Sequence, residues 1–405
     1  MGRSKKQIYP MLCIILMLTG VLILLYLNPA ILQTLPWLSP DENTPNPPAE
    51  QPDGDEPFEG QPPEGNPPEG NPPEGNPPEQ QIPAETIVSL TGRYYTYEEM
   101  KQDMALLASR YPDTMSYRSY GTSADGRDLL VATLGNPDAK GQVIITAGMH
   151  AREYVNSFAV MQQLEYYLVN YDTATYGGHT LRELFDEICF VIVPMTNPDG
   201  ITMAQEGLEA IRISALRDVV RNICRAQGIT GEAAIDKYLN NYWKSNARGV
   251  DINRNFDALW VEHFDGIGKP WVQNYKGYAA MSEVESAYLA ALTESLSNPV
   301  ASVCVHSQGE IIYWRCFQEG VLEIQNRRLA EVAARITGYA IIDENQTEPS
   351  FSNWTILAHG IPTITVETGL GGYPQNHATM ADQIYGDIRD LWAALALEYG
   401  DFAKG

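Results

Sequence analysis

The strongest constraint on the fold is a set of short apolar runs that alternate with segments of helical periodicity. The runs QVIITAGMH, EICFVIV, ASVCVHS and ITVETG are apolar at nearly every position until they end in polar residues. Strands of this kind are buried on both faces, which is typical of parallel sheets whose crossover connections are helices. The sequence therefore predicts an α/β domain with a largely parallel sheet, helices on both faces, and a candidate site where the strands end.

Helical periodicity marks the segments between these runs. We expect helices at 96–113, 153–167, 282–296, 325–338 and 381–403, and a mainly helical peripheral insertion at 205–240. Thr96 is a plausible cap for the first of these helices, with Glu98 or Glu99 in its first turn. The alternation of strands and helices extends over residues 87–405, which we interpret as one domain.

The first 86 residues do not resemble a globular domain. A basic tail at 1–10 precedes an uncharged apolar segment at 11–28, which is near the lower limit for a membrane span. The flanking charges predict a transmembrane signal anchor with a cytoplasmic tail and the rest of the chain outside the cell. A cleaved signal peptide, which would leave a secreted protein, is the alternative. Residues 29–86 are rich in Pro, Glu and Gly, repeat PPEGN, and are predicted to form a disordered spacer.

Charge and cysteine content narrow the class of protein further. The formal net charge is -24, which argues against a nucleic-acid partner. Four cysteines lie outside the apolar segment, and the sequence is compatible with buried thiols or with disulfides. These are Cys189, Cys224, Cys304 and Cys316. No C-x-x-C pair is present, which argues against a zinc site made of cysteines.

Two histidines and one glutamate form a candidate metal site. His150 and Glu153 are three residues apart at the start of an expected helix, and His306 follows another apolar run. Two histidines and a carboxylate, with a fourth position open to water, form the ligand set of a catalytic zinc. Either motif alone is weak, because His-x-x-Glu occurs by chance and a lone histidine at a strand end usually has a structural role. Together they predict one Zn²⁺ per chain.

Three further motifs carry charged or polar groups that this chemistry needs. Asp251 is a candidate for orienting a ligand imidazole, and a turn cap is its alternative interpretation. Asn253 and Arg254 are candidates for binding a substrate carboxylate, because a guanidinium matches that group bidentately. Glu367 ends a buried strand and is the candidate general base, with a structural ion pair as the alternative.

The order H-x-x-E, N-R, H-S and a late strand glutamate is similar to that of the M14 (carboxypeptidase A-like) zinc carboxypeptidases. The resemblance covers roughly residues 92–400 and implies a mixed eight-stranded sheet flanked by helices, one Zn²⁺ and peptide hydrolysis. It carries over the zinc, base and carboxylate-binding assignments given above, and matches Arg152 to a family arginine that lines the substrate cleft.

The sequence departs from the digestive members of that family at two places. They stabilise the oxyanion with an arginine one residue after a tryptophan, where this chain has Lys244, and Arg248 is the alternative group. The position of their mobile tyrosine falls on Asn345, so that role is unassigned. Phe351 and Ser352 fall where the family shapes its side-chain specificity pocket, and neither is charged.

The motifs HSQGEIIYW, NARGVDINRNF and VETG look closer to the bacterial γ-D-glutamyl-L-diamino-acid endopeptidases. That branch cuts peptidoglycan stem peptides between γ-D-Glu and meso-diaminopimelate. We therefore expect a peptide substrate from the cell wall, a membrane-anchored enzyme and a monomeric catalytic domain. A general metallocarboxypeptidase is the first alternative. A catalytically inactive wall-binding module is the second, although it would normally have lost a metal ligand or the base.

Overall fold

The computed structural model describes residues 86–373 and 377–402. The predicted cytoplasmic tail, the predicted signal anchor and all of the predicted spacer except residue 86 lie outside these ranges. Among the helices of the described ranges, none is both long and apolar enough to cross a membrane. The predicted anchor and spacer therefore remain predictions.

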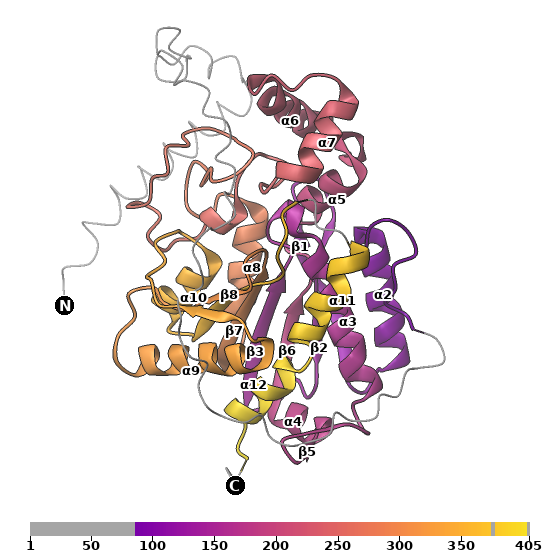
Figure 1. The fold of residues 1–405 in the computed structure, drawn as a ribbon, viewed down its shortest axis with the longest axis vertical. Helices are drawn as coiled ribbons and strands as arrows, with labels where there is room; N and C mark the ends of the chain where they lie inside the picture. The colour runs from indigo at the N-terminus through magenta and orange to yellow at the C-terminus, as the bar shows by residue number, and fades with distance from the viewer. Residues whose placement is uncertain (1–85, 374–376, 403–405) are drawn as a thin grey trace, which may run out of the picture. The chain divides into compact units, whose positions relative to one another are not determined.

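A mixed eight-stranded sheet forms the centre of the domain, in the order β1-β2-β6-β3-β7-β10-β8-β9 (Figure 1). Its strands are β1 (Met115–Thr122), β2 (Asp128–Leu134), β3 (Gly141–Ala147), β6 (Ile188–Val193), β7 (Pro299–His306), β8 (Ile311–Tyr313), β9 (Ala340–Ile342) and β10 (Thr363–Glu367). The four central strands β6, β3, β7 and β10 are parallel, and they include the apolar runs singled out in the sequence. β1 pairs antiparallel with β2, and β2 with β6, at one edge. At the other edge β8 pairs antiparallel with β10 and parallel with β9. The predicted mixed sheet is confirmed.

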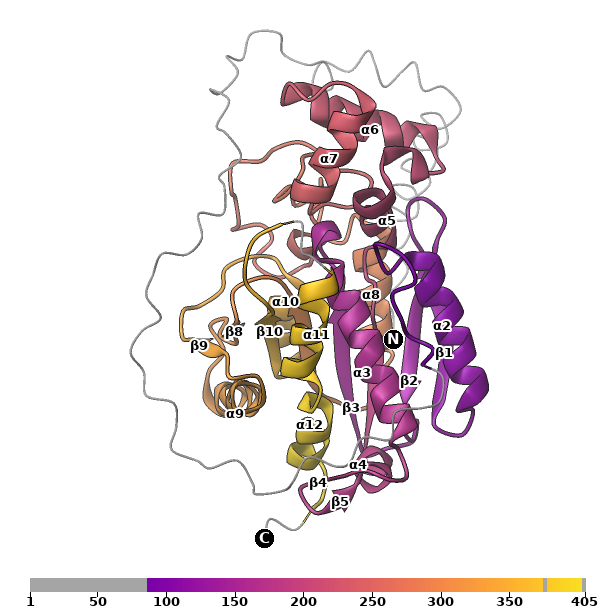
Figure 2. The same ribbon diagram turned by 45° about the vertical axis from the view of Figure 1, so that its right-hand side comes forward.

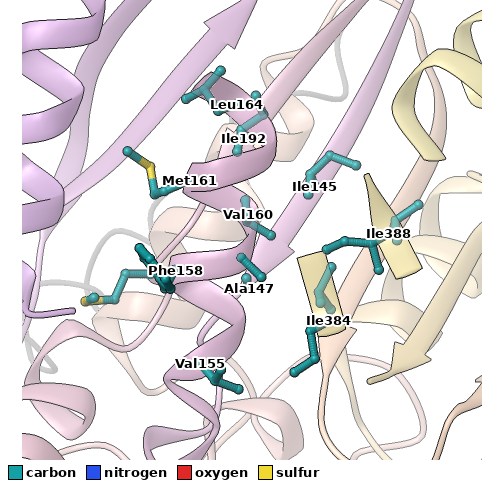
Figure 3. Close-up of a cluster of buried hydrophobic side chains, with 14 of the residues drawn as sticks. Ile145, Ala147, Val155, Phe158, Val160, Met161, Leu164, Ile192, Ile384 and Ile388 are labelled. Carbon is teal, nitrogen blue, oxygen red and sulfur yellow. The ribbon is translucent and has the colours of Figure 1, made fainter. Parts of the chain in front are cut away.

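Helices cover both faces of this sheet, and consecutive strand residues point into different cores. Val143 and Ile145 of β3 belong to the larger apolar cluster, whereas Ile144 belongs to the smaller one. Figure 3 shows part of the larger cluster, in which Val160 of α3 (Val155–Val169) and Ile384 of α11 (His377–Ile388) pack beside the strands. Because both of their faces are buried, the central strands β3, β6, β7 and β10 are apolar at most positions.

The remaining helices include those expected at 96–113, 282–296, 325–338 and in the insertion, and also three that the sequence did not predict, at 181–187, 198–206 and 351–359. They are α2 (Tyr97–Arg110), α4 (Leu181–Glu187), α5 (Pro198–Glu206), α6 (Ser214–Ala226), α7 (Glu232–Tyr242), α8 (Val284–Glu294), α9 (Gly320–Thr337), α10 (Phe351–His359) and α12 (Leu391–Tyr399). α2 begins with the predicted cap, because Thr96 and Glu99 form a reciprocal capping box. α6 and α7 lie together at one end of the domain in Figures 1 and 2, which agrees with a peripheral insertion.

The single helix expected at 381–403 is wrong in one respect, because the segment forms two helices. α11 ends at Ile388 and α12 begins at Leu391. Gln163 of α3 donates from Nε2 to the carbonyl of Ile388 at 2.7 Å, and the Tyr167 hydroxyl donates to that of Arg389 at 2.6 Å. Side chains from α3 thus satisfy carbonyls that a continuous helix would have bonded internally.

All four cysteines in the described part of the chain are free and buried. Burial raises the pKa of each thiol, to about 11 for Cys189 and Cys224 and to about 12 for Cys304 and Cys316. The sequence left disulfides and thiols open, and the structure has thiols.

Candidate metal centre

The predicted site residues gather at the carboxyl edge of the parallel strands. β3 ends at Ala147 and leads after two residues to His150, while β7 ends at His306 itself. Glu367 ends β10 and is the register partner of His306 on the neighbouring strand. The parallel pairing of these strands therefore brings residues more than 150 positions apart in sequence to one edge of the sheet.

The His150–Glu153 segment is a 3₁₀ turn rather than the start of an α-helix. His150 caps the turn η2 (Ala151–Glu153), and α3 begins only at Val155. In a 3₁₀ helix, side chains at positions i and i+3 eclipse each other. The tighter turn therefore aligns the imidazole and the carboxylate more directly than the expected α-helical turn would.

Three ligand atoms converge in a buried position, all within 4.8 Å of one another. His150 Nδ1 is 2.8 Å from Glu153 Oε1, and His306 Nδ1 is 3.1 Å from Glu153 Oε2. The two Nδ1 atoms are 3.2 Å apart. Two imidazole nitrogens and a carboxylate oxygen aimed at one point are the donor set of a catalytic zinc, so the residues fit Zn²⁺.

Electrostatics at the cluster also fit a cation. Burial lowers the pKa of His150, but the Glu153 and Asp251 carboxylates outweigh it and raise that pKa to about 9. Burial raises the pKa of Glu153, yet the two histidines bring it well below its usual value. At neutral pH the metal-free cluster therefore keeps a proton on His150, and a metal ion bound by Nδ1 would displace it.

Asp251 makes the contacts that each of its two interpretations requires. Its Oδ1 lies 3.3 Å from His150 Nε2, on the side of the ring opposite the metal-facing nitrogen. The same Oδ1 accepts from the Asn253 amide at 3.0 Å and caps the turn η4 (Ile252–Arg254). A carboxylate behind a ligand imidazole fixes its tautomer and orientation, so we assign Asp251 a positioning role.

Asn253 and Arg254 lie directly beyond this turn. Asn253 Oδ1 accepts from the Phe351 amide at 3.2 Å, so its Nδ2 group remains a donor. Arg254 donates from one terminal nitrogen to the Asn253 carbonyl at 3.1 Å, while its buried Nε has no hydrogen-bond partner among the described residues. A buried guanidinium nitrogen without a partner is costly, and a substrate carboxylate would satisfy it.

The structure separates Lys244 from Arg248. Burial contributes most to the lowered pKa of His306, and the Lys244 ammonium lowers that pKa further, so Lys244 lies within electrostatic reach of the metal ligand. Arg248 instead directs Nε toward Glu283 Oε2 at 3.7 Å, and its side chain is 45% exposed. Lys244 is therefore the better placed of the two for contact with a group bound at the metal.

Arg152 is buried beside the same edge of the sheet. Its guanidinium lies 4.0 Å from the ring centroid of Tyr373, whose hydroxyl donates to the Ser307 carbonyl at 2.5 Å. Sequence reasoning left the tyrosine role unassigned and did not find Tyr373, because this residue follows the β10 glutamate rather than preceding it. The residue at the family position, Asn345, instead accepts from the Phe317 amide at 2.7 Å.

Phe351 and Ser352, the two residues at the family position of the specificity pocket, have different environments. The Phe351 side chain is fully buried against Phe256 and Trp354, with ring centroids 5.3 Å and 6.0 Å away. Its contribution to the site is therefore the backbone amide that orients Asn253. The Ser352 hydroxyl is 3.0 Å from that of Ser350, which caps α10.

Comparison with known proteins gives one family and several relatives. The sequence model of the family described as zinc carboxypeptidase matches residues 100–394. The γ-D-glutamyl-L-diamino acid endopeptidase 1 of Lysinibacillus sphaericus is 27% identical over 282 residues, which is 69% of this chain and 67% of that protein. Carboxypeptidase A2 of Mus musculus is 26% identical over 225 residues, 55% of this chain and 46% of that protein. The crystal structure of carboxypeptidase A from Helicoverpa armigera superposes with a TM-score of 0.58 at 17% identity, covering 77% of each chain.

Proposed function

We propose that this chain, which belongs to the zinc carboxypeptidase family and is a zinc metallopeptidase, cleaves peptidoglycan stem peptides between γ-D-glutamate and meso-diaminopimelate. The observation that carries the activity is the convergence of His150, Glu153 and His306 beside Glu367 at one strand edge. The relative that is a γ-D-glutamyl-L-diamino acid endopeptidase supports the substrate.

Each residue of the site has a defined task in this proposal. His150, Glu153 and His306 would hold the Zn²⁺, which polarises the scissile carbonyl and lowers the pKa of a bound water. Glu367 would accept a proton from the attacking water and pass it to the leaving amine. Lys244 faces the charge that develops on the carbonyl oxygen, and such a contact is worth about 3 kcal/mol in the transition state.

The leaving side of the substrate meets cations and amide donors. Arg254 and Asn253 bind a carboxylate there, and Arg152 extends the cationic wall toward Tyr373. The three basic residues Arg152, Lys244 and Arg254 near the metal ligands contrast with the acidic chain as a whole, whose net charge is -24. An anionic leaving group fits this local charge, and meso-diaminopimelate supplies two carboxylates.

The test is hydrolysis of a synthetic γ-D-Glu-meso-diaminopimelate peptide by the full-length protein. We expect cleavage that is lost on chelation and lowered by about 10²- to 10⁴-fold in Glu367→Gln, which removes the general base. Glu331→Gln, on the exposed face of α9, is the matched control and should retain full activity. An intact peptide after long incubation with zinc-loaded protein would contradict the proposed substrate.

A general metallocarboxypeptidase is the second candidate function. The similarity to carboxypeptidase A2 and the fold shared with carboxypeptidase A favour it. Release of C-terminal residues from a library of ordinary α-linked peptides, faster than cleavage of the γ-linked peptide, would favour this candidate over the wall enzyme.

We further propose that residues 11–28 anchor the protein in the cell membrane, with the catalytic domain outside and residues 29–86 as the spacer. The support is the uncharged apolar run and its basic flank. A monomeric catalytic domain acting on the wall is the matching arrangement. Membrane fractionation combined with protease accessibility of intact cells tests both points, and a catalytic domain protected from protease would contradict the orientation.

A further inference from the structure

Three polar side chains form a closed hydrogen-bonded triangle directly behind the metal centre. Asn156 Nδ2 donates to Ser307 Oγ at 2.9 Å, and Thr368 Oγ1 donates to Asn156 Oδ1 at 2.7 Å. The third side joins Ser307 Oγ and Thr368 Oγ1 at 3.0 Å. Asn156 and Thr368 are completely buried, and Ser307 is 5% exposed.

The hydrogen positions in this triangle follow from simple counting. The amide nitrogen of Asn156 can only donate, so Ser307 Oγ accepts from it and has its own hydrogen left for Thr368. Thr368 then has one hydrogen, which has two acceptors within reach, Asn156 Oδ1 at 2.7 Å and the His306 carbonyl at 3.0 Å, and the shorter contact assigns it to Asn156. Each group donates once and accepts once, so all three bonds form together and polarise one another. Rotation of any one side chain would break two of the three bonds.

The triangle joins the three segments that carry the proposed chemistry. Asn156 lies three residues after the ligand Glu153, Ser307 follows the ligand His306, and Thr368 follows Glu367. Asn156 belongs to α3, while Ser307 and Thr368 directly follow β7 and β10. A fixed geometry among the three side chains therefore fixes the relative position of the 3₁₀ turn and the two strand ends.

Two backbone contacts extend the triangle to the metal ligands themselves. The Ser307 amide donates to Glu153 Oε2 at 3.2 Å, which orients the ligand carboxylate. The Thr368 amide donates to the His306 carbonyl at 2.8 Å, and the Thr368 hydroxyl is 3.0 Å from the same oxygen. Ser307 and Thr368 are thus directly adjacent in sequence to the ligand His306 and to the general base Glu367, the two residues whose separation must be fixed.

We propose that Asn156, Ser307 and Thr368 act as positioning residues that hold the zinc ligands and the general base in register. This proposal rests on the proposed function, since it gives the triangle the task of setting the distance between metal-bound water and Glu367. A shift of about 1 Å in such a distance costs on the order of 100-fold in rate. Mutation of a residue that supports a metal ligand typically lowers metal affinity by about 10- to 100-fold.

The chain offers a matched control for removing one corner. Thr363 lies on the same strand β10, is 1% exposed, and its hydroxyl bonds Thr355 Oγ1 at 2.7 Å and the Ile361 carbonyl at 3.0 Å. Thr368→Val and Thr363→Val therefore each delete one buried hydroxyl group, the first just after the end of β10 and the second at its beginning. Thr368→Ser keeps the hydroxyl and serves as the rescue variant.

The experiment compares these variants in the full-length protein with two readouts. At saturating zinc, Thr368→Val should lower kcat for the γ-D-Glu-meso-diaminopimelate peptide by about 10- to 100-fold with little change in KM. Thr368→Ser and Thr363→Val should stay close to the unmodified protein. In a chelator competition without substrate, Ser307→Ala should weaken zinc binding by about 10- to 100-fold, and Thr363→Val should not.

Equal kcat, KM and zinc affinity in the Thr368→Val, Ser307→Ala and Thr363→Val variants would overturn the proposal. If Thr368→Val does not fold, the zinc affinity of Ser307→Ala decides. If the unmodified protein binds zinc but cleaves no peptide, the proposed function fails, while the zinc competition still tests the triangle. The two failures are therefore distinguishable.

Discussion

Two buried charge clusters of this domain are built on opposite plans. Around Arg127, the guanidinium lies 2.5 Å from Asp125 Oδ2 and 2.9 Å from Asp199 Oδ1, and all three side chains are at most 4% exposed. The metal centre likewise buries two carboxylates, Glu153 and Asp251, but places the His150 imidazole between them. The first cluster contains its own permanent cation, and the second has room for an external one.

The two clusters differ in whether their polar atoms already have hydrogen-bond partners within the protein. Asp125 and Asp199 also accept from backbone amides and from the Ser123 hydroxyl, and Arg127 donates to the Ala210 carbonyl at 2.9 Å. At the metal centre the three ligand atoms point at one another across a shared space. The Arg127 cluster has all of its charges paired without a ligand. The metal centre, whose ligand atoms point at one shared space, gains stability when it binds a metal.

Removal of zinc should give the largest effect and should act on the second cluster alone. We expect peptide hydrolysis to disappear on chelation and to return with added Zn²⁺. Zinc at about 1,000 times its Kd should raise the free energy of unfolding by about 4 kcal/mol. Thermal unfolding against zinc concentration measures this, and a zinc-independent Tm would erase the contrast between the clusters.

Breaking the first cluster should cost stability and leave zinc binding intact. Arg127→Met leaves Asp125 and Asp199 buried without their cation, and we expect a loss of about 3–5 kcal/mol in the free energy of unfolding. Arg328→Met is the control, because the Arg328 side chain is 53% exposed and its pair with Glu398 should be worth at most about 1 kcal/mol. Denaturant unfolding at fixed zinc measures both variants. A loss of zinc affinity in Arg127→Met would show that the clusters are coupled.

The cation near the metal ligands should matter through charge in the transition state. We expect Lys244→Met to lower kcat by about 10²- to 10³-fold, because in the proposed function its ammonium stabilises the developing oxyanion. Arg248→Met removes the other candidate, which contacts Glu283 instead, and should lower kcat far less. Steady-state kinetics of both variants decide the assignment, and the reverse order would transfer the oxyanion role to Arg248.

The smallest expected effect concerns Glu285, a buried carboxylate that accepts from Ala124 N at 3.1 Å and from Asn246 Nδ2 at 3.3 Å. Burial raises its pKa from 4.5 to about 7. The folded state then binds more protons than the unfolded state between these values, so this group lowers stability as pH rises from about 4.5 to about 7.

Glu285→Gln should remove that pH dependence. Relative to the unmodified protein, the variant should gain on the order of 3 kcal/mol between pH 4.5 and pH 8, a value that follows from the pKa shift. Parallel urea unfolding curves at several pH values measure the difference. A difference that stays constant with pH would show that Glu285 titrates near its ordinary value.

The sequence predicted the central strands because they have strong local signals, and it predicted the metal ligands because several individually weak motifs occur together. β3, β6, β7 and β10 are continuous apolar runs, and their polar ends identify the site. β1 has no such signal, since most of its residues are exposed along the sheet edge. β8 and β9 have only three residues each, which is too short for periodicity.

The supporting residues of the site could not be found from sequence for a different reason. Ser307 and Thr368 belong to the motifs H-S and VETG, but nothing in the sequence links them to each other or to Asn156, and only the packing of α3 against the ends of β7 and β10 brings the three together. Lys244 and Arg248 were equivalent in the sequence because both follow the same tryptophan closely. Their separation needed the direction of each side chain, which depends on where Glu283 packs.

The four buried thiols give the domain a chemical property of their own. With pKa values of about 11 to 12, they carry almost no thiolate near neutral pH, and thiolate is the form that reacts with oxidants and disulfides. No disulfide in the described ranges needs forming or protecting. The described part of the fold is therefore held together without a disulfide, and its thiols are shielded from oxidants for as long as they stay buried.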